Sequence, residues 1–186
     1  MLSAQQQNEL LAVLEHAGRT APLVHSTIHG EHHWQCVARI GAHLARATNG
    51  ADVRFVLLFA VLHDSRRENE NHDPEHGHRA AEFVDELAAA GRVSLDPGPR
   101  SRLRDAIARH SDGEATSDQM IGVCWDADRL CLPRVGISPD RTLLSTAIGR
   151  DSIGWARTQL DDPIEDWRRI VRGAVAPLQE PRTASG

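Results

Sequence analysis

The chain has 186 residues, a length that favours a single domain with a sizeable hydrophobic core. Its net charge of −5 and its lack of any basic block argue against strong nucleic-acid binding. The main apolar run, residues 53–62, is far shorter than the roughly 20 residues that span a bilayer, so no membrane association is expected. The polar N-terminal stretch does not resemble a signal peptide, and we expect a cytoplasmic protein.

Cysteine and histidine usage points to different roles for the two residue types. Cys36, Cys124 and Cys131 are odd in number and lack CxxC spacing, so we expect small buried residues rather than disulfides or a thiolate zinc site. The eleven histidines, in contrast, are concentrated between His25 and His78. Their positions in the predicted elements decide whether they have a chemical role.

The first third of the chain predicts two amphipathic helices. Leucines at helical spacing indicate a helix from Ser3 to His16 that ends at Gly18. A second helix presents an apolar face from Val37 to Thr48. His33 lies one turn before this face and on the same side, so it is expected to point inward.

The third predicted helix is the best functional clue in the sequence. Asp52 is expected to cap a helix over residues 53–62, which is apolar on all sides except for one arginine and is therefore expected at the centre of a bundle. It ends at His63 and Asp64. Burial of a carboxylate beside an imidazole is costly unless a cation or hydrogen bonds compensate, so the pair suggests a metal site. The polar stretch 65–73 that follows is expected to be a loop over this site.

Two more helices are expected to present histidines to the interior. Asp73 and Pro74 are typical of a helix start, with Asp73 as the cap, and they place His76 in a first turn that faces the core. A connection rich in glycine and proline then leads to a helix after Pro99. His110 continues the apolar face of that helix at its C-terminal end.

The last third of the chain has one clear helix and several short ones. Either Ser117 or Asp118 is expected to cap a helix that carries Asp128 on its apolar face. Trp155 and Trp167 are interpreted as packing residues. The shorter helices are expected over residues 140–148, 153–159 and 163–171, and no strand is predicted.

Six polar residues therefore stand where an ordinary helix would carry an apolar one. They are His33, His63, Asp64, His76, His110 and Asp128. A single histidine on such a face is more often a hydrogen-bonded core residue than a ligand, but six coincidences favour a metal site. Nitrogen and oxygen donors without thiolates suit a divalent transition metal such as Mn, Fe, Co, Ni or Zn and do not choose among them.

The pattern of these residues resembles the HD-domain superfamily of metal-dependent phosphohydrolases. An isolated histidine, His33, is followed by the adjacent pair His63-Asp64 after an apolar helix, and Asp128 stands in an Ala-Asp-Arg-Leu sequence. The resemblance covers residues 28–132. It implies an all-α, single-domain helical bundle of the HD-domain type over residues 1–178, and residues 179–186 are expected to form a disordered tail.

The resemblance also implies a ligand set. His33, His63, Asp64 and Asp128 would bind one metal ion. His76 and His110 would either complete a second site, with Asp64 bridging the two ions, or contact a substrate phosphate. One or two ions are thus both compatible with the sequence.

The activity that the resemblance implies is hydrolysis of a small-molecule phosphate ester, such as a nucleotide, by metal-activated water. Asp64 would act at the metal. The candidates for binding the substrate phosphate are Arg66, Arg67 and Arg129, whose alternative role is to form ion pairs with nearby acidic residues. His29 and Asp126 are considered as orienting residues or proton carriers.

Two other functions remain open at this point. Similar ligands occur in di-iron oxygenases of the same fold, which resemble myo-inositol oxygenase. The other hypothesis is a non-catalytic helical domain that binds a metal ion for structural stability or binds a nucleotide as a sensor. The absence of any tyrosine, and so of a Gly-Tyr-Pro motif, argues against the cyclic-dinucleotide phosphodiesterase branch. No sequence pattern indicates an oligomeric state.

Overall fold

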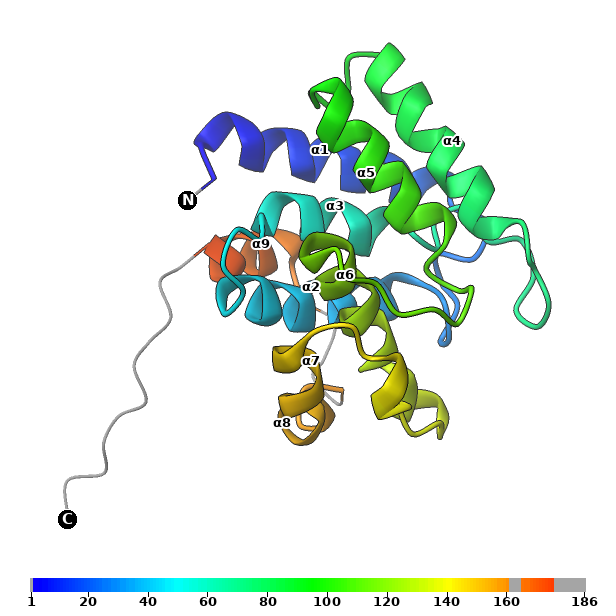
Figure 1. Cartoon of the computed structure of the whole chain (residues 1–186). Coiled ribbons are helices and arrows are strands. Elements are labelled where there is room, and N and C mark those ends of the chain that lie inside the picture. The colour runs from blue at the N-terminus through cyan, green and yellow to red at the C-terminus, as the bar shows by residue number, and fades with distance from the viewer. Residues whose placement is uncertain (1, 161–164, 176–186) are drawn as a thin grey trace.

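The computed structural model describes residues 2–160 and 165–175 (Figure 1). Within these ranges every regular element is helical, which confirms the predicted all-α class. None of these helices combines the length and the apolar character needed to cross a membrane. The elements are α1 (Ala4–Thr20), α2 (Glu31–Arg46), α3 (Val53–Leu62), α4 (His76–Ala89), α5 (Pro97–Ala108), α6 (Gln119–Arg129), η1 (Leu132–Val135), η2 (Arg141–Leu143), α7 (Ala147–Asp151), α8 (Ile153–Arg157) and α9 (Trp167–Val175).

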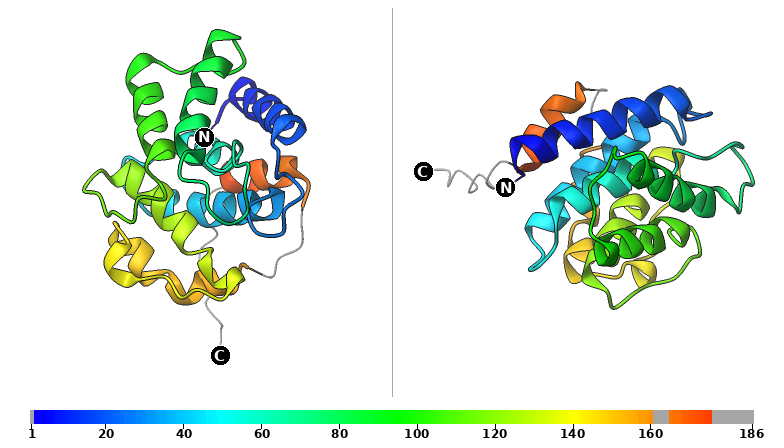
Figure 2. Two further views of the ribbon diagram at one scale, coloured as in Figure 1. Left: turned by 90° about the vertical axis from the view of Figure 1, so that its right-hand side faces the viewer. Right: turned by 90° about the horizontal axis from the view of Figure 1, so that it is seen from above.

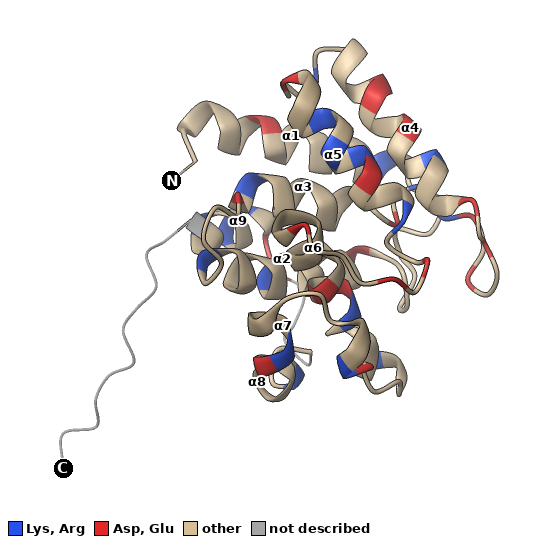
Figure 3. Cartoon of the chain, viewed as in Figure 1, with Lys and Arg blue, Asp and Glu red and all other residues tan. Residues whose placement is uncertain are grey.

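Helix α3 forms the centre of the bundle, as its composition predicts. Residues 55–62 are all buried, and the helix packs against α1, α2, α4, α5, α6 and α9. Its ribbon is almost free of charged residues (Figure 3). The carboxylate of Asp52 accepts the backbone N–H of Arg54 at 2.8 Å, so the predicted cap is confirmed.

Two helix pairs pack around α3. Helices α4 and α5 lie side by side, and α2 packs against both α3 and α6 (Figure 2). Gly41 permits the close packing of α2, because a Cβ there would meet the side chains of Val56 on α3 and Ala127 on α6. This arrangement brings the C-terminal end of α3 close to ends of α2, α4, α5 and α6.

Several helix boundaries differ from the prediction. Helix α1 continues past Gly18, which does not adopt the positive φ of a helix-ending glycine. Helix α4 begins at His76 and not at the expected proline, because the carboxylate of Asp73 is engaged by Arg79 instead of capping the helix. Helix α5 begins two residues earlier than expected. Of the two possible caps for α6, Asp118 is the one that accepts its first N–H groups.

The predicted helix over residues 140–148 is wrong. The chain instead forms the short turn η2 and then α7. The cause is Asp126, whose carboxylate accepts the backbone N–H groups of Ser145 at 2.6 Å and Thr146 at 2.8 Å. The hydroxyl of Thr146 in turn caps α7 through the N–H of Gly149. These bonds break the helical pattern between residues 143 and 147.

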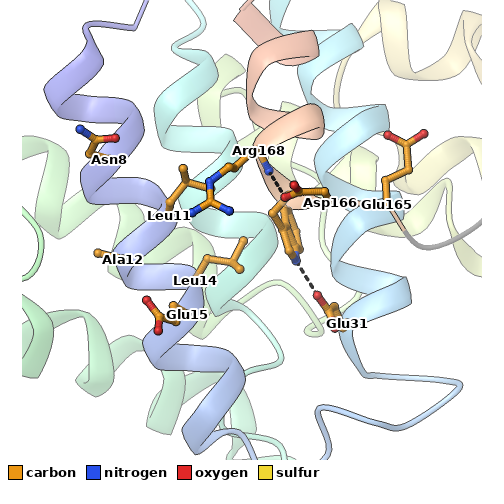
Figure 4. Close-up of a pocket in the computed structure, with 10 residues that line it drawn as sticks. Asn8, Leu11, Ala12, Leu14, Glu15, Glu31, Glu165, Asp166 and Arg168 are labelled. Carbon is orange, nitrogen blue, oxygen red and sulfur yellow. Dashed lines mark hydrogen bonds between the residues drawn. The ribbon is translucent and has the colours of Figure 1, made fainter.

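The last helix, α9, packs against α1 and α2. Trp167 at its start is buried, in agreement with its predicted packing role, and its indole N–H donates to Glu31 at 2.8 Å. A groove of about 690 Å³ lies between these helices, with Leu11, Leu14 and Glu15 on its α1 side (Figure 4). The predicted helix 163–171 starts outside the described residues, and the expected tail 179–186 lies entirely outside them.

Candidate metal centre

The structure brings the six predicted metal ligands together although five helices supply them. His33 lies in the first turn of α2, His63 and Asp64 directly follow α3, His76 begins α4, His110 follows α5 and Asp128 lies in the last turn of α6. The side chain of Asp128 is 21% exposed, and the other five residues are at most 5% exposed. The cluster is therefore a buried polar site with one accessible edge.

A first donor group consists of His33, His63, Asp128 and one oxygen of Asp64. The Nε2 atoms of His33 and His63 are 3.1 Å apart. Asp128 Oδ1 lies 3.1 Å from His33 Nε2 and 3.8 Å from His63 Nε2. Asp64 Oδ2 lies 3.6 Å from each of these two nitrogens. Four potential ligand atoms thus converge on one point.

A second donor group consists of His76, His110 and the other oxygen of Asp64. The Nε2 atoms of His76 and His110 are 3.0 Å apart. Asp64 Oδ1 lies 3.3 Å from the first nitrogen and 3.7 Å from the second. One carboxylate therefore contributes an oxygen to each group and links them.

Backbone carbonyls fix the tautomers of the second donor group. His76 donates its Nδ1–H to the carbonyl of Asp73, and His110 donates its Nδ1–H to the carbonyl of Ile107 at 2.7 Å. A carbonyl oxygen only accepts, so both Nδ1 atoms carry the hydrogen. In the neutral rings, both Nε2 atoms then present lone pairs to each other at 3.0 Å. Two lone pairs at this distance repel each other, and a proton or a cation between the rings would remove the repulsion.

The first donor group is oriented in the same way. His63 directs Nδ1–H at the carbonyls of Phe59 and Ala60, at 3.2 and 3.1 Å. Its Nε2 is therefore free to act as a ligand and faces the Nε2 of His33. Ligand histidines in metalloproteins are typically held by such a second hydrogen bond. The Nδ1 of His33 has no hydrogen-bond partner among the described residues.

The donor separations fit a metal ion. Ligand atoms that bind one ion at about 2.1 Å are about 3.0 Å apart at right angles and about 3.4 Å apart at the tetrahedral angle. The separations within both groups, 3.0 to 3.8 Å, bracket these values. Asp64 Oδ1 is also buried without a hydrogen-bond partner among the described residues. Neither donor group includes a cysteine, so the chemistry of the set suits a divalent ion with nitrogen and oxygen ligands.

The electrostatics of the cluster favour the ligand forms of its residues, with the exception of His110. Burial lowers the pKa of His33, His63 and His76, that of His63 to about 3. Burial alone would raise the pKa of Asp64, but the surrounding imidazoles hold it well below its usual value. For His110, the carboxylate of Asp64 outweighs burial and raises the pKa. An ionised carboxylate among mostly neutral imidazoles is the protonation state that binds metal.

Of the three arginines expected to bind phosphate, only Arg67 lies at the cluster. Arg67 is buried, and its Nη1 lies 3.2 Å from both ring nitrogens of His76 and 3.8 Å from Asp64 Oδ1. Arg66 turns away, because its guanidinium packs 3.3 Å above the Phe83 ring.

Arg129 is also directed elsewhere. Its guanidinium donates to the carbonyl of Leu143 and lies 5.5 Å above the Trp125 ring. Asp126, considered as an orienting residue, instead holds the turn before α7 and does not face the cluster. These two residues stabilise the packing of α6, and within the described residues no hydrogen bond or ion pair joins their side chains to either donor group.

His29 reaches the cluster although it precedes α2. Its Nδ1 lies 3.2 Å from Asp64 Oδ2, and its Nε2 lies 3.9 Å from Oε2 of the partly buried Glu70. The ring is 18% exposed, so it stands at the accessible edge between the buried carboxylate and solvent. Its spacing of four residues before His33 was the only sequence signal for this position.

Sequence reasoning missed a glycine that sets the geometry of the second donor group. Gly77 directly follows His76, and a Cβ there would lie 2.6 Å from the carbonyl oxygen of Ala108 and 2.9 Å from that of Ile107. The absence of a side chain therefore lets α4 approach the C-terminal end of α5. This approach brings the His76 and His110 rings together.

No protein-family model matches the chain, and comparisons with curated proteins and with solved structures gave no significant match. The assignment of the centre therefore rests on its own geometry and chemistry.

We expect Gly77→Ala to weaken metal binding at the second donor group. The added methyl group pushes α4 away from α5, separates His76 from His110 and should lower the affinity of that group about tenfold, as loss of ligand orientation does elsewhere. The measurement is calorimetric titration with Mn²⁺ or Co²⁺. Gly98→Ala is the matched control, since a Cβ at this helical glycine meets open space. Equal loss of binding in both variants would contradict the role of Gly77.

Proposed function

We propose that the protein is a divalent-metal-dependent phosphohydrolase. The observation that carries the proposal is the position of Asp64, which offers one carboxylate oxygen to each of two histidine groups. Such an arrangement suits two ions that share a bridging ligand. It also agrees with the resemblance of His33, His63-Asp64 and Asp128 to the HD-domain pattern.

The ions proposed are drawn from Mn, Fe, Co, Ni and Zn. The first donor group offers four ligand atoms and the second offers three, so ions that take five or six ligands would keep positions open for water and substrate. A divalent ion held by these residues would lower the pKa of a bound water and would polarise a phosphoryl oxygen.

The residues of the chain then have distinct tasks in hydrolysis. The P–O bond to the leaving group is replaced by a bond to a water oxygen, and negative charge on the phosphoryl oxygens has to be stabilised. Arg67 is the cation placed for this task, because its guanidinium is buried beside His76 and Asp64. His29 fixes Asp64 Oδ2 from the accessible edge. The proposed substrate is a small phosphate ester such as a nucleotide.

Arg67 is also what favours hydrolysis over the two other functions that the ligand set allows. An oxygenase needs its ions to activate dioxygen and has no need of a buried guanidinium beside them. A purely structural metal site would have all its positions filled by protein ligands, whereas the second donor group offers only three. Oxygen consumption with iron bound, without phosphate release, would support the oxygenase instead.

We expect Asp64→Ala to abolish retention of both metal ions, because the Asp64 carboxylate contributes an oxygen to each of the two donor groups. His110→Ala removes a ligand from the second group only and is expected to retain one ion per chain. Elemental analysis of the purified variants measures both stoichiometries. Asp151→Ala, at a side chain that is 72% exposed, serves as the control. Undiminished metal content in Asp64→Ala would refute the site.

Arg67 and its neighbour Arg66 provide a matched pair for the catalytic role. Arg67→Ala is expected to lower kcat/KM for phosphate-ester hydrolysis about 10- to 100-fold, the equivalent of one or two charge-assisted hydrogen bonds. Arg66→Ala removes the same charge one residue away but loses packing on Phe83 and bonds to the Thr20 hydroxyl and the Ser65 carbonyl, none of which belongs to a donor group. It should leave kcat/KM unchanged. Phosphate release from p-nitrophenyl phosphate and nucleoside monophosphates measures both, and equal effects would contradict the assignment.

A further inference from the structure

The side chain of Arg79 on α4 binds the loop 65–73 between α3 and α4 at several points. Its Nε and Nη2 donate to the carbonyl of Arg66 at 3.2 and 3.0 Å. Its Nη2 also donates to both carboxylate oxygens of Asp73, at 2.8 and 2.7 Å. The same carboxylate accepts the backbone N–H of Glu68 at 2.8 Å. The beginning, middle and end of the loop are thus connected to one guanidinium.

Asp73 connects this guanidinium to the metal centre. Its carboxylate is held by Arg79, while its backbone carbonyl accepts the Nδ1–H of His76. The position of that carbonyl sets the orientation of the imidazole, whose Nε2 lies 3.3 Å from Asp64 Oδ1. Displacement of Asp73 would therefore turn a ligand of the second donor group and would leave the first group untouched.

The loop also holds Arg67 at the cluster. Arg67 Nε donates to the carbonyl of Asn69 at 3.0 Å, and its Nη2 lies 3.5 Å from that of Asn71. These bonds depend on the curvature of the loop that Arg79 maintains. Arg79, which lies outside the cluster, thus helps to position both His76, a proposed metal ligand, and Arg67, the proposed phosphate-binding residue.

We propose that Arg79 is a positioning residue for the second donor group, acting on His76 through Asp73 and on Arg67 through the loop. The Arg79 side chain is 31% exposed and contacts no donor atom of either group, so its effect on metal binding is indirect. The inference rests on the proposed metal-dependent function, but it concerns one half of the centre only.

The test compares Arg79→Gln with Arg104→Gln in the full chain. Arg104, on α5, donates to the carbonyl of Ala81 and pairs with Asp85 at 3.0 Å, so it also joins a carbonyl and a carboxylate of α4, far from the loop. In titrations with Co²⁺, Arg79→Gln is expected to keep one ion at unchanged affinity and to bind the second about tenfold more weakly. Arg104→Gln is expected to bind both ions like the unmodified chain.

Two further variants separate positioning from general stability. Asp73→Ala is expected to reproduce the loss, and the double variant with Arg79→Gln should lose no more than either alone, because both residues act on one path. Arg79→Lys keeps the charge with fewer donors and is expected to recover part of the second-ion affinity. It also provides the comparison if Arg79→Gln fails to fold.

The outcomes are distinguishable. Unchanged binding of the second ion in folded Arg79→Gln, or equal weakening of both ions, would overturn the inference. An unmodified chain that binds a single ion would overturn it together with the two-ion centre. An unmodified chain that binds two ions, shows the expected losses in the variants and hydrolyses no phosphate ester would support the positioning role and refute the proposed function.

Discussion

The structure is organised around a charge that has to be compensated in the interior. Asp64 follows the most apolar helix of the chain and is only 5% exposed. An isolated carboxylate in such a place carries a desolvation cost of several kcal/mol, so compensating groups must surround it. Five imidazoles and a buried guanidinium do so, but Oδ1 still accepts no hydrogen bond from the described residues. Divalent ions on both sides of the carboxylate would complete the compensation.

Helix ends provide the means to orient these imidazoles. The last carbonyls of a helix have no partner within the helix and carry partial negative charge. His63 uses the carbonyl of Ala60 and also approaches that of Phe59, which accepts the backbone N–H of His63. His110 uses the carbonyl of Ile107 in α5. A histidine placed just after a helix thus satisfies an unpaired acceptor, fixes its own tautomer and directs Nε2 inward. The same helix ends favour a cation in the space that they enclose.

Helical periodicity predicted most of the helices and the inward direction of the six candidate ligands, and the resemblance to the HD-domain pattern implied that they form one set. A polar residue on an apolar stripe must face the core, whichever helices pack against it. The direction of an arginine does not follow from periodicity. Arg66 and Arg67 are adjacent and chemically equal, and their different contacts, with Phe83 and Thr20 for Arg66 and with His76 and Asn69 for Arg67, separate their roles.

Hydrogen bonds and contacts between residues far apart in the chain could not be predicted from the sequence either. Asp73 has the residue type and position of a helix cap, but Arg79 competes for its carboxylate. Asp126 breaks a predicted helix nearly twenty residues away through the N–H groups of Ser145 and Thr146. Gly77 has an ordinary place in a helical pattern, and its importance becomes visible only when α5 is packed against it.

The most direct test of the central claim is an anomalous-difference map from crystals of the protein grown with Mn²⁺. We expect two peaks, one on each side of the Asp64 carboxylate. The first should lie among His33, His63 and Asp128, and the second between His76 and His110. A single peak would reduce the centre to one ion. The absence of any peak within the cluster, in crystals that contain the metal, would contradict the claim that Asp64 links two metal-binding groups.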